Sequence, residues 1–152
     1  MQIFKTTLIS TTLFFSGFAV ADNQDIVGQW RSIDDKTGFS KGIVEIKKDG
    51  KGMYSGNIIE VIPRPGYTAK THCYKCPAPY TDKPIIGLQV LTNMYPDPKK
   101  VGEYQGGTIL DPLTGKLYKS RIKLNTTGTR LTMRGFVGVE VIGRSQTWVR
   151  IQ

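Results

Sequence analysis

Hydrophobic and polar residues alternate along this chain in short runs, and turn-forming residues separate the runs. The clearest run places Tyr118, Ile122 and Leu124 on one face and Lys119 and Lys123 on the other. A period of two residues indicates β-strands with one buried face. No stretch sustains the period of about 3.6 residues that predicts a helix. We therefore predict strands over residues 27–34, 42–47, 52–62, 85–93, 107–110, 116–125, 130–139 and 145–151.

The connections between these strands are mostly short and carry ordinary turn residues. Asp49-Gly50 predicts a tight hairpin, because glycine supplies the positive φ that such turns require. Asp34, Asp35 and Asp111 could be read as carboxylates for acid–base chemistry. Each precedes a glycine at the spacing of a turn, where an aspartate side chain caps the turn amides. We interpret all three as turn formers.

Short consecutive strands favour an all-β fold, a single antiparallel up-and-down β-barrel of about eight strands. The chain has 152 residues, of which 39% are hydrophobic, so it can bury one core. No internal repeat or second domain is visible in the sequence. A barrel of this size has an interior that side chains fill or that holds one small ligand.

Two longer loops interrupt the pattern, over residues 63–84 and 94–103. The first loop carries five prolines and both cysteines of the chain. Proline cannot donate to a sheet ladder, so this segment does not fit a central strand. His72, the only histidine, lies in the same loop. We interpret it as an exposed loop residue, because the sequence offers no positioned nucleophile beside it.

Cys73 and Cys76 form a C-x-x-C motif that admits several interpretations. A thioredoxin-like redox pair normally sits at a helix N-terminus, whereas this pair lies in a proline-rich loop. Haem attachment needs a histidine directly after the second cysteine, where Pro77 stands. A zinc site could recruit His72 but lacks an evident fourth ligand. We predict a disulfide that pins the loop, with redox and metal roles as alternatives, and we expect no cofactor.

The first residues have the three parts of a secretory signal peptide. Lys5 supplies a positive charge, an apolar run follows, and the small residues that end at Ala21 fit a cleavage site. The apolar run is shorter than the roughly 20 residues that a membrane span needs. We predict a signal peptide over residues 1–21, a barrel domain over residues 22–152, and a periplasmic or secreted product with no transmembrane segment after cleavage.

The chain is basic, with 21 lysines and arginines, 12 acidic residues and a net charge of +9. Such a protein could attract an anionic envelope surface, or the charge could serve only solubility. The expected compartment argues against nucleic acid as a partner. The sequence contains neither a phosphate-binding glycine loop nor a nucleotide fingerprint.

Several short motifs occur in a fixed order along the chain. They are Gly28-x-Trp30, Asp34-Asp35, Cys73-x-x-Cys76, Ile109-Leu110-Asp111-Pro112, Gly115-Lys116-x-Tyr118, Arg134-Gly135-Phe136 and Gly143-Arg144-x-Gln146-x-Trp148-x-Arg150. In this order the sequence resembles the domain-of-unknown-function 2147 family of secreted bacterial proteins. The resemblance implies a lipocalin-like or calycin-like barrel and an extracytoplasmic compartment, and it implies no catalytic residues.

The first of these motifs is similar to the G-x-W of lipocalin and calycin barrels. Such barrels often stack a basic residue from the last strand on the tryptophan, and here Arg150 is the candidate, with Arg144 second. Arg134 alternates with Leu131 and Met133, which form the better core face, so we predict that Arg134 points outward. If Arg134 or Arg144 enters the barrel, the buried cation needs an internal acid or an anionic ligand as its partner.

These observations favour a binding protein over an enzyme. We expect it to hold a small apolar or anionic ligand in the barrel or at its mouth. One alternative is an envelope-associated module with a filled barrel and a basic face, and another is a redox protein that uses Cys73 and Cys76. The candidate ligand-binding or barrel-end residues are Trp30, Tyr118, Arg134, Arg144, Trp148 and Arg150.

Overall fold

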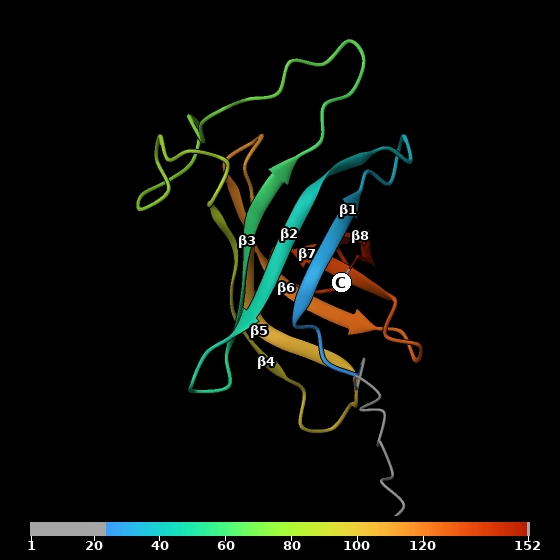
Figure 1. Ribbon diagram of the computed structural model, residues 1–152. Helices are drawn as coiled ribbons and strands as arrows, with labels where there is room; N and C mark the ends of the chain where they lie inside the picture. The colour runs from blue at the N-terminus through green and yellow to red at the C-terminus, as the bar shows by residue number, and fades with distance from the viewer. Residues whose placement is uncertain (1–23, 152) are drawn as a thin grey trace, which may run out of the picture.

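The computed structural model describes residues 24–151, and the signal peptide predicted over residues 1–21 lies outside this range. Eight antiparallel strands close into a barrel, in which each strand pairs with its neighbours in the chain and the last strand pairs with the first (Figure 1). The predicted fold class is confirmed. The strands are β1 (Gly28–Ile33), β2 (Ser40–Lys48), β3 (Tyr54–Val61), β4 (Gln89–Pro96), β5 (Glu103–Asp111), β6 (Lys116–Leu124), β7 (Arg130–Phe136) and β8 (Gly143–Arg150).

Strands β4 and β5 differ most from the prediction, because Pro96 and Gly106 lie within them at positions that a strand tolerates. The strand predicted over residues 85–93 is β4, which starts later and runs on to Pro96, where proline ends the strand. The strand predicted over residues 107–110 is β5, which starts at Glu103. Gly106, with φ of 81°, lies at a register shift within β5, so it makes a bulge instead of ending the strand.

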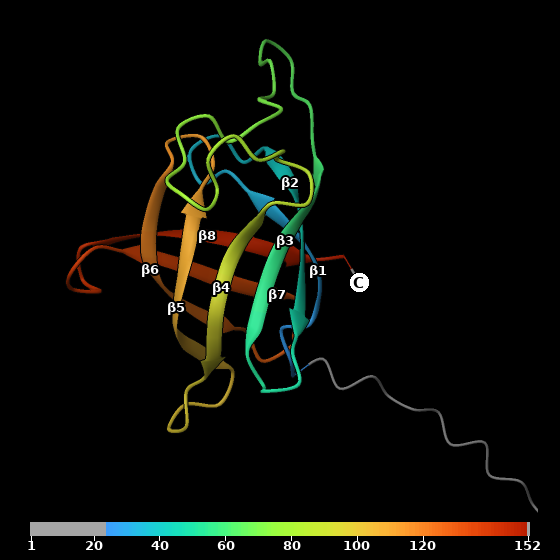
Figure 2. The same ribbon diagram turned by 90° about the vertical axis from the view of Figure 1, so that its left-hand side faces the viewer.

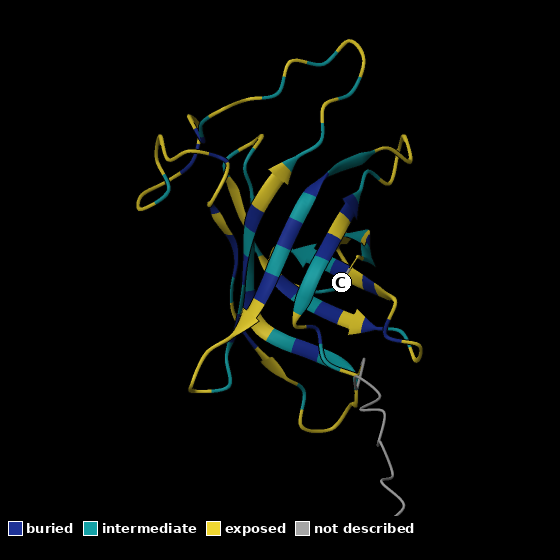
Figure 3. Cartoon of the chain, viewed as in Figure 1, coloured by how far each residue is buried: buried dark blue, intermediate teal, exposed yellow. Residues whose placement is uncertain are grey.

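One end of the barrel is packed with large side chains. Ile26, Trp30, Tyr54 and Tyr104 are all buried there, and the rings of the two tyrosines meet edge to face with 5.0 Å between centroids. Burial, and then the neighbouring Asp25 carboxylate, raises the pKa of Tyr54 to about 12. The Tyr54 hydroxyl therefore stays protonated and donates to Asp25 at 2.9 Å. Figure 3 shows the alternation of buried and less buried residues along β1 and β2 that builds this core.

A long loop, residues 62–88, arches over the opposite end of the barrel (Figures 1 and 2). We call it the covering loop. It is fastened at its end to β3, where the amide of Ile58 donates to Leu88 and the amide of Gly87 donates to Ile58. Within the loop, Cys73 and Cys76 form a disulfide. Residues 24–151 contain no helix with the length and apolar character of a membrane span.

Candidate functional site

The packed end of the barrel is closed by a tryptophan and an arginine. The Trp30 indole is fully buried, and its Nε1 donates to the carbonyl of Ile26 at 2.8 Å. The Arg150 guanidinium, from β8, lies 4.3 Å from the centre of the Trp30 ring.

The same guanidinium also contacts backbone on both sides of the β1–β8 pairing that closes the barrel. It donates to the carbonyls of Gly128 at 2.6 Å, Val27 at 2.8 Å and Asp25. Burial lowers the pKa of Arg150 below its ordinary value, but the group remains a cation near neutral pH. Its donors are engaged by backbone carbonyls, so this end of the barrel is a structural plug.

Two adjoining cavities occupy the other end of the barrel. The larger has a volume of about 460 Å³ and lies against the side of the barrel made by β5 to β8. The smaller, of about 150 Å³, lies against β1 to β3 and reaches the covering loop. Both are bounded by Lys41 and by residues 109–112. Apart from a few polar groups, the walls are aliphatic and aromatic, which is typical of a small-molecule site.

Strand β8 contributes alternate residues to the whole length of the interior. Arg144 and Gln146 line the larger cavity, Trp148 lines the smaller one, and Arg150 reaches the plug. Since side chains of a strand alternate between faces, these four share the inner face of the barrel. The Trp148 indole is buried, and its Nε1 finds no hydrogen-bond acceptor among the described residues.

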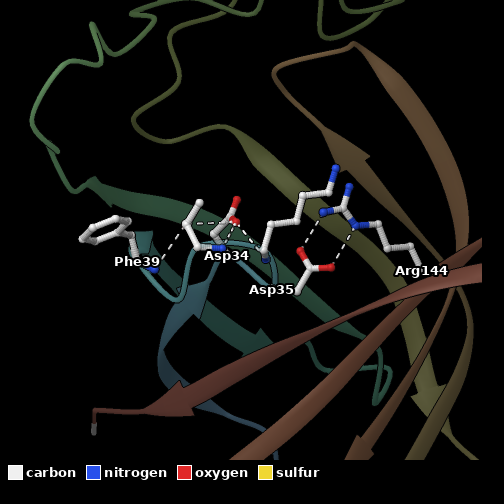
Figure 4. A network of polar contacts seen from close by, with 6 residues as sticks. Asp34, Asp35, Phe39 and Arg144 are labelled. Carbon is white, nitrogen blue, oxygen red and sulfur yellow. Dashed lines mark hydrogen bonds and ion pairs between the residues drawn. The ribbon is translucent and has the colours of Figure 1, made fainter.

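The mouth of the larger cavity carries an ion pair. Arg144 donates to both carboxylate oxygens of Asp35, at 2.6 Å and 3.1 Å (Figure 4). Hydrogen bonding from Arg144 lowers the pKa of Asp35, and the charge of Lys41 acts in the same direction. The Arg144 side chain is 55% exposed. Its cation is therefore at the rim, and the acid it needs comes from the loop between β1 and β2.

The neighbouring aspartates shape turns. Asp34 accepts hydrogen bonds from the amides of Lys36 and Thr37, both at 3.0 Å. Burial would raise the pKa of Asp34, but these hydrogen bonds outweigh it and the pKa is lowered. Asp111 accepts from the amide of Leu113 at 2.9 Å and so caps the turn between β5 and β6.

Two other candidate residues lie on opposite sides of the barrel wall. Tyr118 lines the larger cavity. Arg134 lies on the outer face and donates to the carbonyls of Glu140 at 2.9 Å and Val141 at 3.0 Å, and to the hydroxyl of Ser145 at 2.9 Å. Arg134 therefore supports the connection between β7 and β8 and lines neither cavity.

The cysteine pair is enclosed by its own loop and by the turn between β5 and β6. Both cysteines are buried, and a Cβ at Gly115 would collide with the carbonyl of Lys75. His72 Nδ1 lies 3.0 Å from the hydroxyl of Thr71. Within residues 24–151, no cluster of histidine, cysteine and acidic side chains is arranged to hold a metal ion.

Sequence reasoning did not single out Lys41 or Gln146 as cavity residues. Lys41 lies at the start of β2 and borders both cavities. Gln146 lies on the inner face of β8, between Arg144 and Trp148. The period of two along β8 is the signal that could have found Gln146, because Trp148 on the same face is apolar and buried.

A sequence model of bacterial proteins described as "Uncharacterized protein conserved in bacteria (DUF2147)" matches residues 28–150. This chain belongs to the DUF2147 family. The match runs from the glycine of the first strand to the arginine of the plug, and so covers the whole barrel. Among curated proteins, no relative matches this DUF2147 chain.

A solved structure, described as protein HP1028 from the human pathogen Helicobacter pylori and as belonging to the lipocalin family, is similar in fold. The similarity covers 84% of each chain, with a TM-score of 0.68 and 22% sequence identity. At this identity the likeness concerns the fold alone. This DUF2147 chain is therefore a lipocalin-like barrel.

Proposed function

We propose that this protein binds a small, partly apolar molecule in the larger cavity at the open end of the barrel. The observation that carries the proposal is the larger cavity, of about 460 Å³, at the open end of a barrel whose other end is plugged. This volume falls within the roughly 300–1,000 Å³ of ordinary ligand sites. The apolar part of the ligand would lie against Met133 and Ile109, and its polar part would lie near Lys41 and Arg144 at the rim.

Two alternatives receive less support. A module with a filled barrel would have side chains where the two cavities lie. A redox protein needs a thiol or disulfide that a partner can reach, and the residues of the Cys73–Cys76 disulfide are buried. We do not expect the site to select strictly for anionic ligands, because the Arg144 cation at the rim is already paired with Asp35.

The two tryptophans of the chain offer a test that locates the ligand. Trp148 lines the smaller cavity and its indole N–H is unpartnered, whereas the Trp30 N–H is fixed to Ile26 within the plug. In ¹⁵N-labelled protein titrated with decanoate and with 1-decanol, we expect the Trp148 indole resonance to move and the Trp30 resonance to stay. A titration in which neither ligand binds would contradict the proposal, whereas binding that leaves the Trp148 signal in place would confine the ligand to the larger cavity.

Three substitutions test where the ligand lies and which charge it prefers. Gln146→Trp places a large ring in the larger cavity and should weaken binding at least about tenfold by calorimetry, since it removes the space for the ligand. Lys123→Trp, on the exposed outer face of β6, is the matched control and should leave affinity unchanged. Asp35→Asn frees Arg144 and should favour decanoate over decanol by about two- to fivefold, the size of an exposed ion pair.

A further inference from the structure

The connection between β7 and β8 exposes a group of aliphatic side chains. Residues 137–142, which we call the hairpin tip, extend beyond the barrel wall (Figure 2). Sequence alternation predicts that the strand continues to residue 139, but β7 ends at Phe136. The exposed fractions at the tip are 68% for Val137, 61% for Val139, 88% for Val141 and 75% for Ile142.

Polar contacts with Arg134 and Arg121 hold the hairpin tip in place. The Arg134 guanidinium donates to the carbonyls of Glu140 and Val141, and the amide of Ile142 donates to Val139 at 3.2 Å. Glu140, the single charged residue of the tip, is drawn back toward Arg121, with 3.3 Å between its carboxylate and Nε. The backbone is thus fixed while the aliphatic side chains remain largely exposed.

Such a group differs from an ordinary exposed hydrophobic residue. Single exposed aliphatic residues are common on protein surfaces, and Val101, 99% exposed on the loop between β4 and β5, is an example. Contiguous apolar groups on a protruding segment usually contact a partner or a membrane. The tip contains no aromatic ring and no hydrogen-bonding side chain apart from Glu140, so it suits a hydrocarbon phase better than a patterned protein surface.

Three cations near the tip have no carboxylate partner among the described residues. Arg134 donates only to neutral acceptors, so its charge is not cancelled by its contacts. Lys119 lies opposite Phe136 in the β6–β7 ladder and is exposed. Lys41 borders the same cavity as Val137 and Ile142. Arg144 pairs with Asp35, and Arg121 is shared by Glu140, Glu103 and Asp97. Asp34 and Asp111 also lie near Arg144, and both accept hydrogen bonds from the amides of their own turns.

We propose that the hairpin tip docks this protein on an anionic phospholipid bilayer. Val139, Val141 and Ile142 would enter the boundary between head groups and acyl chains, and Arg134 and Lys119 would lie at the level of the lipid phosphates. The net charge of +9 would bring the protein to such a surface. The docking does not depend on the ligand proposal, although Val137 and Ile142 also line the larger cavity and would place its mouth against the bilayer.

The first test measures partition onto vesicles of phosphatidylethanolamine with phosphatidylglycerol, with phosphatidylcholine vesicles as the neutral reference. We expect wild-type protein to bind the anionic vesicles and to bind the neutral ones more weakly. The triple variant Val139→Ser/Val141→Ser/Ile142→Ser should bind anionic vesicles at least about tenfold more weakly, because the apolar term is lost. Val101→Ser, the matched control, should bind like the wild type.

A second measurement follows the depth of the tip directly. Tryptophan at position 141 in a Val141→Trp variant should show a blue-shifted emission with anionic vesicles and should be quenched by brominated acyl chains. Tryptophan at position 101 in a Val101→Trp variant should show neither effect. Trp30 and Trp148 are buried and provide a constant background.

Three results would overturn the proposal. Equal binding of the wild type and the triple variant would mean that basic residues alone attract the vesicles. Absence of wild-type binding to anionic vesicles would remove the membrane as the partner. A lipid-free dimer that dissociates in the triple variant, seen by sedimentation velocity, would assign the tip to contact between copies of this chain.

Discussion

Replacing Trp30 with alanine should destabilise the barrel more than any single change outside the core. The indole is fully buried, and truncation of a buried tryptophan to alanine costs about 3–5 kcal/mol through lost burial and the cavity left behind. The substitution also removes two polar contacts of the indole, whose energies are partly included in this cost. The carbonyl of Ile26 loses its donor, worth about 1 kcal/mol, and the Arg150 guanidinium loses the ring beneath it, worth about 0.5–2 kcal/mol.

A double-mutant cycle separates the stacking from the packing. Trp30→Ala, Arg150→Met and their combination would be unfolded in urea, with far-UV circular dichroism as the signal. The sum of the two single losses of unfolding free energy should exceed the loss in the double variant by about 1 kcal/mol. Each single change already removes the contact between ring and guanidinium, so the sum counts that contact twice. Trp30→Phe retains an aromatic ring and should cost less than Trp30→Ala.

Two outcomes would refute this reasoning. A loss below about 1 kcal/mol for Trp30→Ala would mean that the indole does not hold the plug together. Additivity within about 0.3 kcal/mol in the cycle would mean that the 4.3 Å contact contributes no stacking energy.

Three further predictions concern the turns and the loop at the open end. Cys73→Ser/Cys76→Ser should keep the β-sheet spectrum and cost about 2 kcal/mol, because the disulfide lies outside the barrel ladder; loss of the spectrum would show that the loop is required for folding. Asp35 has a pKa lowered by Arg144, so its ion pair stabilises the folded state above about pH 4 and loses this effect as the pH falls through the lowered pKa. Melting temperatures of the wild type and Asp35→Asn should therefore differ at pH 7 and converge near about pH 2, and a constant difference would contradict the assignment. Gly115→Ala should cost about 1–3 kcal/mol and speed proteolysis within residues 63–84, because φ is 75° and the new Cβ would strike the covering loop; unchanged proteolysis would show that this contact does not hold the loop.

The strand order could be predicted because alternation is a local property. On β6, the inward position of Ile122 and Leu124 follows from a period of two and needs no knowledge of the neighbouring strands. Bulges and strand ends are different, because they depend on what lies opposite. A glycine such as Gly106 can end a strand or form a bulge within it. Here the ring of Tyr95 packs where a Cβ of Gly106 would lie, and the strand continues past the bulge.

The cavity could not be predicted for a related reason. Its volume is the space left after side chains from β5 to β8 are placed in register, and contacts such as the close approach of Ile109 and Tyr118 to Gly135 depend on that register. Alternation along the last strand could predict that Arg144 lies near the barrel mouth, but it could not predict that Arg144 pairs with Asp35. Asp35 and Arg144 are 109 residues apart, and only closure of the barrel brings them together.

The plug has a consequence for the order in which the chain can fold during synthesis. Its cation belongs to residue 150, whereas the ring and the carbonyls that receive it lie between residues 25 and 30, apart from Gly128. Until the ribosome has released residue 150, β1 lacks one of its two neighbours and Trp30 lacks its cover. Contacts of such long sequence separation form slowly. The nascent chain therefore cannot close its barrel until synthesis is nearly over.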